Sequence, residues 1–456
     1  MWGSRGVRIG ALAIFLAGCA SATRSQDEGE RVSSRRFALT SETRAFQFNL
    51  PVGSDPSQWL GSASVSLQIS DRVQLLGAGS GHGAIASSGT SASSVGTDAN
   101  TGTIISNSAL TVRDRSTVHG DALSNSTLTF GVGTSATGTA KGAAGVNFQP
   151  FSWKITFPAS GGNVTVPNGA VVSVNPGSAG IVTVNSSGTL KLSSGTYYFD
   201  ELSLQPQATL AVNTTSGPVF LWVRNTLAFR GATSYTGPND RLLIGYAGTA
   251  SPAFDKSPDA TVVAPLADVR LGVGGSPYTG AFFAKSLTLD PAVTFTQRAF
   301  SGWSALPFSV VPRFECVETR AHSKVAIFGY TNPRSTSVTL PIGADNRFLP
   351  GPSDRLQLST FLPGDQSGAV AVSWINFKPS WSLNGLTADV DLTKACPLSY
   401  NVIATSDATV KLGAPLRNRI LFFRWDRDSI RWSVSTARLC VRLSARTDLS
   451  RQRDSS

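Results

Sequence analysis

Residues 180–192 read Gly-Ile-Val-Thr-Val-Asn-Ser-Ser-Gly-Thr-Leu-Lys-Leu, two short apolar-polar alternations separated by Asn-Ser-Ser-Gly. Alternation with a period of two is typical of a β-strand with one buried face, and Asn, Ser and Gly favour turns. Such runs recur roughly every ten to twenty residues between about residues 45 and 308. The others are Ser64–Ile69, Ala109–Val112, Thr127–Phe130, Asn163–Val166, Thr209–Val212, Val219–Val223, Thr226–Phe229, Leu242–Ile244, Ala267–Leu271 and Ser286–Leu289.

The composition agrees with a chain of short strands. Of 456 residues, 41% are hydrophobic and only 15% charged, against a usual charged share of about 25%. Gly, Ser and Thr make up the difference, which suits turns and strands and disfavours long helices. The length predicts about three domains.

One strand-turn unit repeats along the chain. Leu67-Gln-Ile-Ser-Asp-Arg72 is echoed by Leu110-Thr-Val-Arg-Asp-Arg115. Repetition of a short unit is typical of a solenoid, in which stacked turns bury a shared stripe of Leu, Val, Ile and Phe. We expect an all-β solenoid over residues 46–311. Gly and Ser crowd the stretch Gly77–Gly102, where we expect an exposed loop in place of regular turns.

Two motifs carry a resemblance to known families. The first motif is Ser194-Gly-Thr-Tyr-Tyr-Phe199 with Gly217-Pro-Val-Phe-Leu-Trp-Val223, and the second is Tyr278-Thr-Gly-Ala-Phe-Phe-Ala-Lys-Ser286. With them the chain resembles a bacterial, myxobacterial-type surface β-solenoid domain of unknown function. That domain also follows PilX-type pilus-assembly segments and is similar to bactofilins and other polymer-forming proteins. The resemblance covers roughly residues 190–296. It implies a right-handed parallel β-helix over residues 46–311 and no particular activity.

A second module is expected at residues 312–397, where proline and aromatic residues rise. Four runs have the composition of short β-strands: Lys324–Tyr330, Ser337–Leu340, Ala369–Trp374 and Leu386–Val390. Asn384-Gly385 is a strong hairpin signal. A disulfide between Cys316 and Cys396 would close this segment, which predicts a small sandwich. The stretches that carry a resemblance are Phe328–Asn332, Pro341–Phe348 and Trp381–Gly385. In them the segment resembles a small secreted bacterial β-domain without assigned chemistry.

The first residues predict export. Arg5 and Arg8 precede a short apolar run that ends in Leu16-Ala-Gly-Cys19, which resembles a bacterial lipobox. We expect residues 1–18 to be a signal peptide, Cys19 to carry the lipid and residues 19–45 to form a flexible tether. An ordinary secretory signal is the alternative. Ala20 after the cysteine favours, by resemblance to enterobacterial sorting, an outer-membrane lipoprotein of the cell envelope.

The basic charge is concentrated in the tail. Residues 397–456 hold eleven Lys and Arg against five Asp and Glu, which is +6 of the total formal charge of +11. The tail, 398–456, could pair Arg419–Trp425 with Ser429–Val434, form a basic surface, or be an unstructured extension; Cys440 is left unpaired. No motif typical of nucleic-acid binding occurs, so we expect no nucleic-acid partner.

Catalytic patterns are sparse. Polysaccharide-cleaving β-helices need clustered carboxylates. The acids of the solenoid are interpreted as corner residues, and the three histidines lack metal-ligand spacing. His82 is expected to be solvated, and a proton-shuttle role for His119 beside Asp114 and Asp121 was weighed as a minor alternative. We therefore expect no catalytic residue, metal or cofactor.

The resulting hypothesis is a non-enzymatic structural or adhesion lipoprotein that organises the cell surface. Partners would be the membrane, polysaccharide or surface proteins, and copies of the chain stacked through the β-helix ends. The aromatics proposed to face glycans are Tyr235, Tyr246, Tyr278 and Trp303, with Trp222 considered, whereas Tyr197, Tyr198, Phe199, Trp222 and Phe229 are expected in the core. The alternatives are a carbohydrate-active β-helix enzyme and a pilus-associated component.

Overall fold

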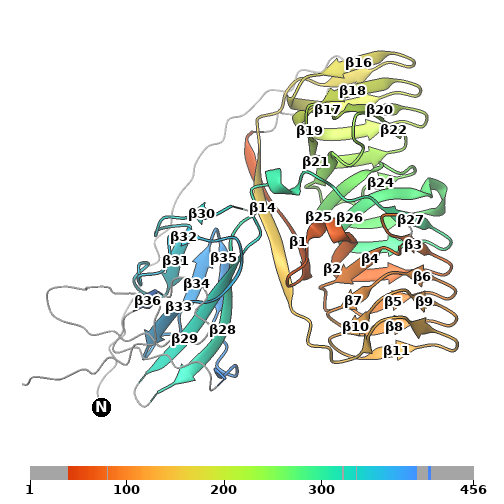
Figure 1. The fold of residues 1–456 in the computed structure, drawn as a ribbon. Helices are drawn as coiled ribbons and strands as arrows, with labels where there is room; N and C mark the ends of the chain where they lie inside the picture. The colour runs from red at the N-terminus through yellow and green to blue at the C-terminus, as the bar shows by residue number, and fades with distance from the viewer. Residues whose placement is uncertain (1–39, 80, 321–322, 335, 398–408, 412–456) are drawn as a thin grey trace, which may run out of the picture. The chain divides into compact units, whose positions relative to one another are not determined.

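A computed structural model describes residues 40–79, 81–320, 323–334, 336–397 and 409–411 (Figure 1). The expected all-β class is confirmed: a parallel β-solenoid of about 12 turns is followed in sequence by antiparallel sheets. The proposed lipid-bearing Cys19, Cys440 and the expected tail hairpin lie outside the described residues.

The solenoid is built from two groups of strands and three short 3-10 helices. The first group comprises β2 (Trp59–Ile69), β3 (Gln74–Leu76), β4 (Ala84–Ser87), β5 (Ser93–Val95), β6 (Asn100–Thr101), β7 (Ile104–Ser106), β8 (Leu110–Val112), β9 (Thr117–Val118), β10 (Ala122–Ser124), β11 (Leu128–Phe130), β12 (Ser135–Ala136) and β13 (Ala140–Lys141). The second comprises β15 (Val164–Val166), β16 (Val171–Val174), β17 (Gly177–Val184), β18 (Thr189–Ser193), β19 (Gly195–Leu204), β20 (Thr209–Asn213), β21 (Val219–Phe229), β22 (Ala232–Thr236), β23 (Leu242–Tyr246), β24 (Ala253–Phe254), β25 (Ala260–Leu271), β26 (Tyr278–Leu289) and β27 (Thr294–Gln297). The 3-10 helices are Pro56–Gln58, Val273–Gly275 and Trp303–Ala305.

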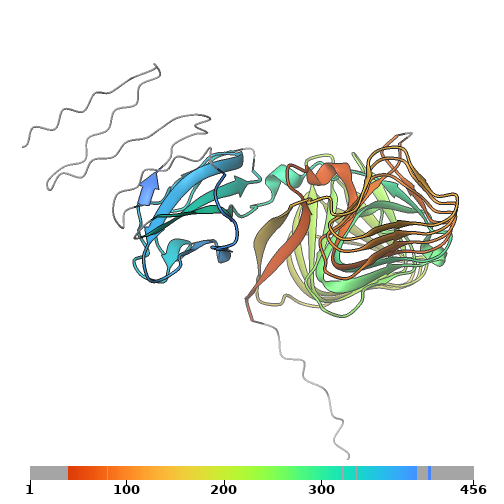
Figure 2. The ribbon, with the colours of Figure 1, turned by 90° about the horizontal axis from the view of Figure 1, so that it is seen from below.

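Each turn of the solenoid has three sides. In the turn that starts at Ile104, β7 forms the first side, β8 the second and β9 the third. Longer strands such as β19 bend at a corner and cover the first two sides, with a register irregularity between Phe199 and Glu201. Figure 2 shows the turns superposed one behind another. Their inward side chains form one core of mainly Leu, Val, Ile and Phe, as the alternation predicted.

Residues 84–102 of the Gly/Ser-rich stretch belong to the regular stack, so the expected exposed loop was wrong there, while Ala78, Gly79 and Gly81 are exposed outside any strand. Strands β4, β5 and β6 of this stretch pair in parallel with β7, β8 and β9, and Ile85, Ile104, Ala122 and Ala140 align at steps of 18 or 19 residues. Fully buried serines take interior positions here. They are Ser87, Ser93, Ser106, Ser116 and Ser124.

These serines fit the interior because most of their hydroxyls find polar partners there. The hydroxyl groups of Ser93 and Ser106 lie 2.9 Å apart. Ser116 donates to the carbonyl of Gly96, and Ser124 to the carbonyls of Ser108 and Thr127. A satisfied hydroxyl is tolerated inside a protein, so small polar residues can line the interior of a turn.

The order of the turns in space differs from their order in sequence. Strand β26 pairs in parallel with β25 on one edge and with β2 on the other, where Gly61 aligns with Phe282 and Ile69 with Leu289. The first group of turns, residues 59–141, therefore stacks onto the last turn of the second group. We call the β2–β26 contact the seam; in Figure 1 it lies where the red-orange turns meet the green ones.

A two-stranded antiparallel ribbon connects the two groups along the side of the stack. It consists of β1 (Glu42–Pro51) and β14 (Phe148–Phe157), with Phe46 opposite Trp153. Its aromatic side chains pack on the outer face of the solenoid: the ring centroids of Phe48 and Phe283 are 4.2 Å apart, and those of Phe46 and Trp222 5.0 Å. Since β1 begins at Glu42, the last residues of the expected tether are strand.

A buried charge pair fixes the end of this ribbon. Arg224 is 2% exposed, and its Nε lies 3.4 Å from Oδ1 of Asp200. The two terminal nitrogens of Arg224 donate to the carbonyls of Pro158 (2.6 Å) and Thr40 (3.4 Å), and the ring of Phe157 lies beneath the guanidinium. Strands β19 and β21 are thereby joined to both strands of the ribbon at the end where Glu42 lies opposite Phe157.

The C-terminal module consists of antiparallel sheets around one core, as expected. Phe328, Phe348, Val370 and Trp381 meet in that core. The disulfide between Cys316 and Cys396 is confirmed, and so is the hairpin at Asn384-Gly385, both with positive φ. The strands are β28 (Val311–Thr319), β29 (Lys324–Asn332), β30 (Val338–Thr339), β31 (Asn346–Leu349), β32 (Thr360–Phe361), β33 (Gly364–Trp374), β34 (Ser380–Leu383), β35 (Leu386–Asp389) and β36 (Thr409–Lys411).

Candidate functional site

The two ends of the solenoid each present strands with a free edge. At one end, β15 pairs with β17 and β16 with β18, and no described residue pairs with their other edges. At the opposite end, β11 pairs with β8 and β12 with β9, and again the described chain supplies no second partner. A free edge carries unpaired backbone N–H and C=O groups that can accept another strand. We call these the β15–β16 end and the β11–β12 end.

At both ends the outermost strands of the second and third sides carry no charged side chains, whereas Lys141 of β13 lies over the first side at the β11–β12 end. Residues 122–140 and 158–190 contain no Asp, Glu, Lys, Arg or His. Natural edge strands are usually protected by charges, by Pro within the strand, by bulges or by a covering segment. The strands β11, β12, β15 and β16 contain neither charge nor Pro. Their edges are therefore chemically suited to pairing with another parallel strand.

The interior of each end is only half covered. Leu128, Phe130 and Ala136 at the β11–β12 end pack against the solenoid core but stay partly exposed, and so do Val164, Val172 and Val174 at the β15–β16 end. Another turn placed on either end would remove this apolar surface from water, which is favourable. The sequence analysis predicted contacts through the β-helix ends but did not identify these apolar residues. The uncharged runs 122–140 and 158–190 could have indicated where the ends lie.

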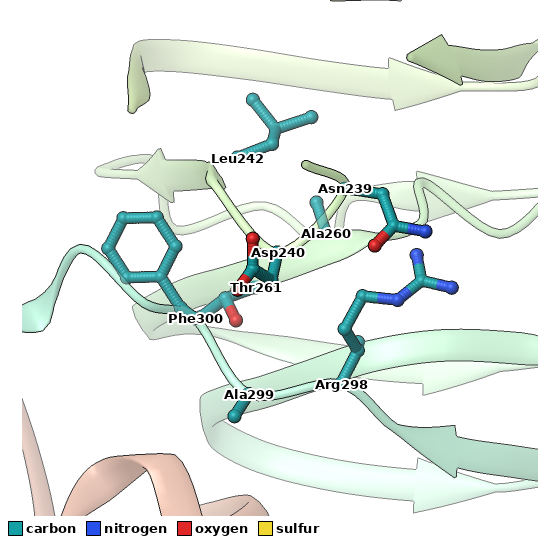
Figure 3. A pocket seen from close by; sticks show the side chains of 9 residues that line it. Asn239, Asp240, Leu242, Ala260, Thr261, Arg298, Ala299 and Phe300 are labelled. Atoms are coloured by element: carbon teal, nitrogen blue, oxygen red, sulfur yellow. The ribbon is translucent and has the colours of Figure 1, made fainter. Parts of the chain in front are cut away.

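A shallow hollow lies at the corner between β22 and β23 (Figure 3). Asn239, Asp240, Thr261, Arg298 and Phe300 line it, and it encloses about 140 Å³, part of which is open to solvent. Small-molecule sites are clefts or cavities that bury most of the ligand's surface. This hollow is shallow and partly open to solvent, so it cannot enclose a ligand in that way.

Two polar side chains beside this hollow are already engaged. Arg298 forms an ion pair with Asp259, and the Tyr235 hydroxyl donates to the backbone carbonyl of Asp259. Burial raises the pKa of the Asp259 carboxyl, while the positive charge of Arg298 acts in the opposite direction. Burial also raises the pKa of Tyr235 above its usual range. This arrangement stabilises a corner of the solenoid.

The aromatics proposed to face glycans do not form an exposed platform, which corrects that prediction. Tyr246, Tyr278 and Trp303 are 1%, 0% and 8% exposed. Tyr246 and Tyr278 lie in the solenoid core, and Tyr235 packs against it half-buried. Each of the three tyrosine hydroxyls donates to a backbone carbonyl.

The expected core aromatics divide between two clusters. Tyr197, Phe199 and Phe229 are inside the solenoid, as predicted. Tyr198 and Trp222 point to the outer face of the solenoid and pack against the aromatic side chains of the β1–β14 ribbon instead. The ribbon buries Trp222 and partly covers Tyr198, and no local sequence pattern indicated this element.

The histidines of the solenoid lie against each other. The rings of His82 and His119 are stacked with centroids 3.7 Å apart, and the expected solvated His82 is half-buried beside an exposed His119. Desolvation and the neighbouring His82 lower the pKa of His119. The Oδ1 atoms of Asp114 and Asp121 accept the backbone N–H groups of Val132 and Thr139, as corner residues of the next turn. The proton-shuttle arrangement is therefore not formed.

The described part of the chain contains no group of three or more His, Cys, Asp or Glu side chains placed to hold a metal ion. It also contains no helix long and apolar enough to cross a membrane. Asp71, an acid interpreted as a corner residue, accepts the backbone N–H of Thr97 in that role.

No protein-family model, curated protein or solved structure matches this chain. The site must therefore be judged on its geometry. The two solenoid ends are the surfaces whose unpaired backbone groups, uncharged outermost strands and partly exposed core residues point to the same kind of contact.

Proposed function

We propose that this protein is a structural component of the bacterial cell envelope whose solenoid assembles end to end with copies of itself. The observation that carries the proposal is that the outermost strands β11, β12, β15 and β16 are uncharged and keep free edges. Soluble β proteins normally protect such edges because they template association. Here their exposure serves the assembly.

The occupant of each end is another copy because the two ends match. Strands β11 and β15 both form the second side of a turn, and β12 and β16 both form the third. All neighbouring strands in the stack run parallel, so β11 of one copy can continue onto β15 of the next without reversal. The seam between β2 and β26 provides the precedent: two turns distant in sequence already stack there through strand pairing and side-chain packing.

Export and anchoring complete the proposal. The lipobox-like Leu16–Cys19 would attach a rod of stacked copies to the membrane, and the outer membrane is the proposed location. The resemblance to myxobacterial-type, PilX-associated and bactofilin-like solenoid domains supports a role in surface organisation or adhesion. Mass spectrometry of the mature protein, with Cys19→Ser as control, tests the anchor: a diacylglyceryl adduct is expected on the wild type only.

The assembly is tested with lysine substitutions at inward positions of each end. In Val172→Lys and Phe130→Lys, the long side chain can reach solvent in a single molecule but would be buried charged in a stack. Sedimentation velocity over a concentration series should show growing rods for the wild type and monomers for each variant. Val171→Lys and Thr129→Lys, at outward exposed positions of the same strands, are the matched controls and should assemble normally.

Mixing the two inward variants gives a stricter test. Each retains one intact end, so an equimolar mixture of Val172→Lys and Phe130→Lys should form dimers and stop there. Circular dichroism of each variant checks the fold. A wild type that stays monomeric at about 100 µM, or inward variants that assemble as well as the controls, would contradict the proposal.

A further inference from the structure

The C-terminal module exposes large apolar side chains at one tip. Ile375 and Phe377 follow the last residue of β33, and they are 64% and 71% exposed; Leu392 follows β35 and is 51% exposed. Strand register brings the two loops together. Ser380 pairs with Asp389, and continuing this antiparallel register places Lys378 opposite Asp391 and Phe377 opposite Leu392. These three apolar residues therefore belong to one surface, which we call the apolar tip.

Lysines flank the apolar tip. Lys378 and Lys394 are exposed neighbours of Phe377 and Leu392 in sequence. Hydrogen bonds from the side chain and backbone of Thr393 lower the pKa of Asp391, and the charges of Lys378 and Lys394 lower it further. Both ammonium groups thus lie near the same carboxylate, between the two loops. On the adjacent strand, Lys324 pairs with Trp374, the last residue of β33.

The two loops are held by a rigid frame. Cys396 is bonded to Cys316 of β28, and the backbone between them is doubly hydrogen-bonded: Val317 N–H donates to Lys394 at 2.9 Å, and Cys396 N–H donates to Val317 at 3.0 Å. On the other loop, Pro379 and Trp381 are buried. The tip therefore presents its apolar side chains without a hydrophobic partner while the backbone beneath them is fixed.

We propose that the apolar tip binds the surface of an anionic phospholipid bilayer, with Phe377, Ile375 and Leu392 entering the interface and the lysines contacting the headgroups. Protruding apolar side chains flanked by cationic ones are suited to such a surface, because the apolar parts leave water while the charges stay at the headgroups. Three side chains on two loop tips are too few for a stable protein interface, which buries more than about 1,000 Å². This proposal is independent of end-to-end assembly.

The test is flotation of the full chain with lipid vesicles, using Cys19→Ser so that no acyl chain contributes. Vesicles of phosphatidylcholine with about 30% phosphatidylglycerol are compared with pure phosphatidylcholine. We expect binding to the anionic vesicles that weakens as salt rises. The double variant Phe377→Ser/Leu392→Ser should bind at least tenfold more weakly, and so should Lys378→Glu/Lys394→Glu.

The matched control is Leu362→Ser. Leu362 is also an exposed apolar residue, 41% exposed, but it precedes β33, whereas the tip follows it. At about 3.3 Å per residue, the strand separates the two by roughly 30 Å. This control should bind like the parent. The proposal is overturned if the parent does not bind anionic vesicles, binds both vesicle types equally, or binds equally after the tip substitutions, as it would if the basic residues 398–456 alone were responsible.

Discussion

Gly61 and Phe282 approach each other more closely than any side chain would allow. A Cβ atom added to Gly61 would lie 2.2 Å from the carbonyl oxygen of Phe282. The two residues are aligned across the seam, 221 positions apart in sequence. The first turn of the chain thus meets the last one at a position where only glycine fits.

Gly61→Ala should therefore destabilise the protein by about 1–3 kcal/mol, since the methyl group must force β2 and β26 apart. Urea unfolding followed by intrinsic fluorescence measures the effect. Gly274→Ala is the control, because a Cβ there meets no atom within 4 Å. Equal stability of the two variants would show that the seam is looser than described.

The pair of Arg224 and Asp200 should be sensitive to removal of either partner. Arg224→Met or Asp200→Asn leaves one group without its buried partner, which typically costs 3–5 kcal/mol. Arg224→Met also frees the carbonyls of Pro158 and Thr40. The double variant should be less destabilised than the sum of the single ones. Additive losses in thermal or urea unfolding would mean that the two side chains do not interact.

The disulfide should contribute to stability through the length of the loop it closes. Cys316 and Cys396 are 80 residues apart, for which the loop-entropy model gives about 4–5 kcal/mol. Cys316→Ser/Cys396→Ser should lower the free energy of unfolding of the C-terminal module by that amount, measured in urea unfolding. Adding reductant should destabilise the wild type and leave the double variant unchanged. A wild type indifferent to reductant would contradict this role.

Tyr278 should make the solenoid sensitive to alkali. Burial raises the pKa of its hydroxyl to about 12, above the ordinary value of 10. Because ionisation is disfavoured in the folded state, the stability from this group is complete below pH 10 and is lost as pH rises toward 12. The shift corresponds to about 2–3 kcal/mol.

The comparison variant is Tyr278→Phe. It should be less stable at neutral pH, because the carbonyls of Phe254 and Gly272 lose their donor. Its stability should fall less steeply between pH 10 and 12 than that of the wild type. Parallel curves in urea titrations at these pH values would show that another group dominates.

The turns were predictable from the sequence because their information is local. Alternation in runs such as Thr189–Leu192 reports which side chains point inward, and it holds in the structure. The echo of Leu67–Arg72 in Leu110–Arg115 was also informative: Ile69 pairs with Val95 and Val95 with Val112, so the two copies lie two turns apart. The disulfide and the Asn384-Gly385 hairpin followed from spacing and turn chemistry.

What the sequence did not indicate depends on contacts between distant segments. The seam, the ribbon and the burial of Trp222 beneath Phe46 each join residues about 100 or more positions apart, for which no local pattern exists. The Gly77–Gly102 prediction failed over residues 84–102 for a different reason. Interior serines such as Ser93 are polar by composition, yet they are satisfied by hydrogen bonds within the turn.

The seam also constrains how this protein can fold. The turns of residues 59–141 are synthesised first, but the face of β2 that will meet β26 stays uncovered until about residue 289 has left the ribosome. Contacts of such long sequence separation form slowly, because closing a large loop costs entropy before the contact is made. A chain that must keep one unpaired face for so long benefits from a chaperone that holds it until the second half arrives.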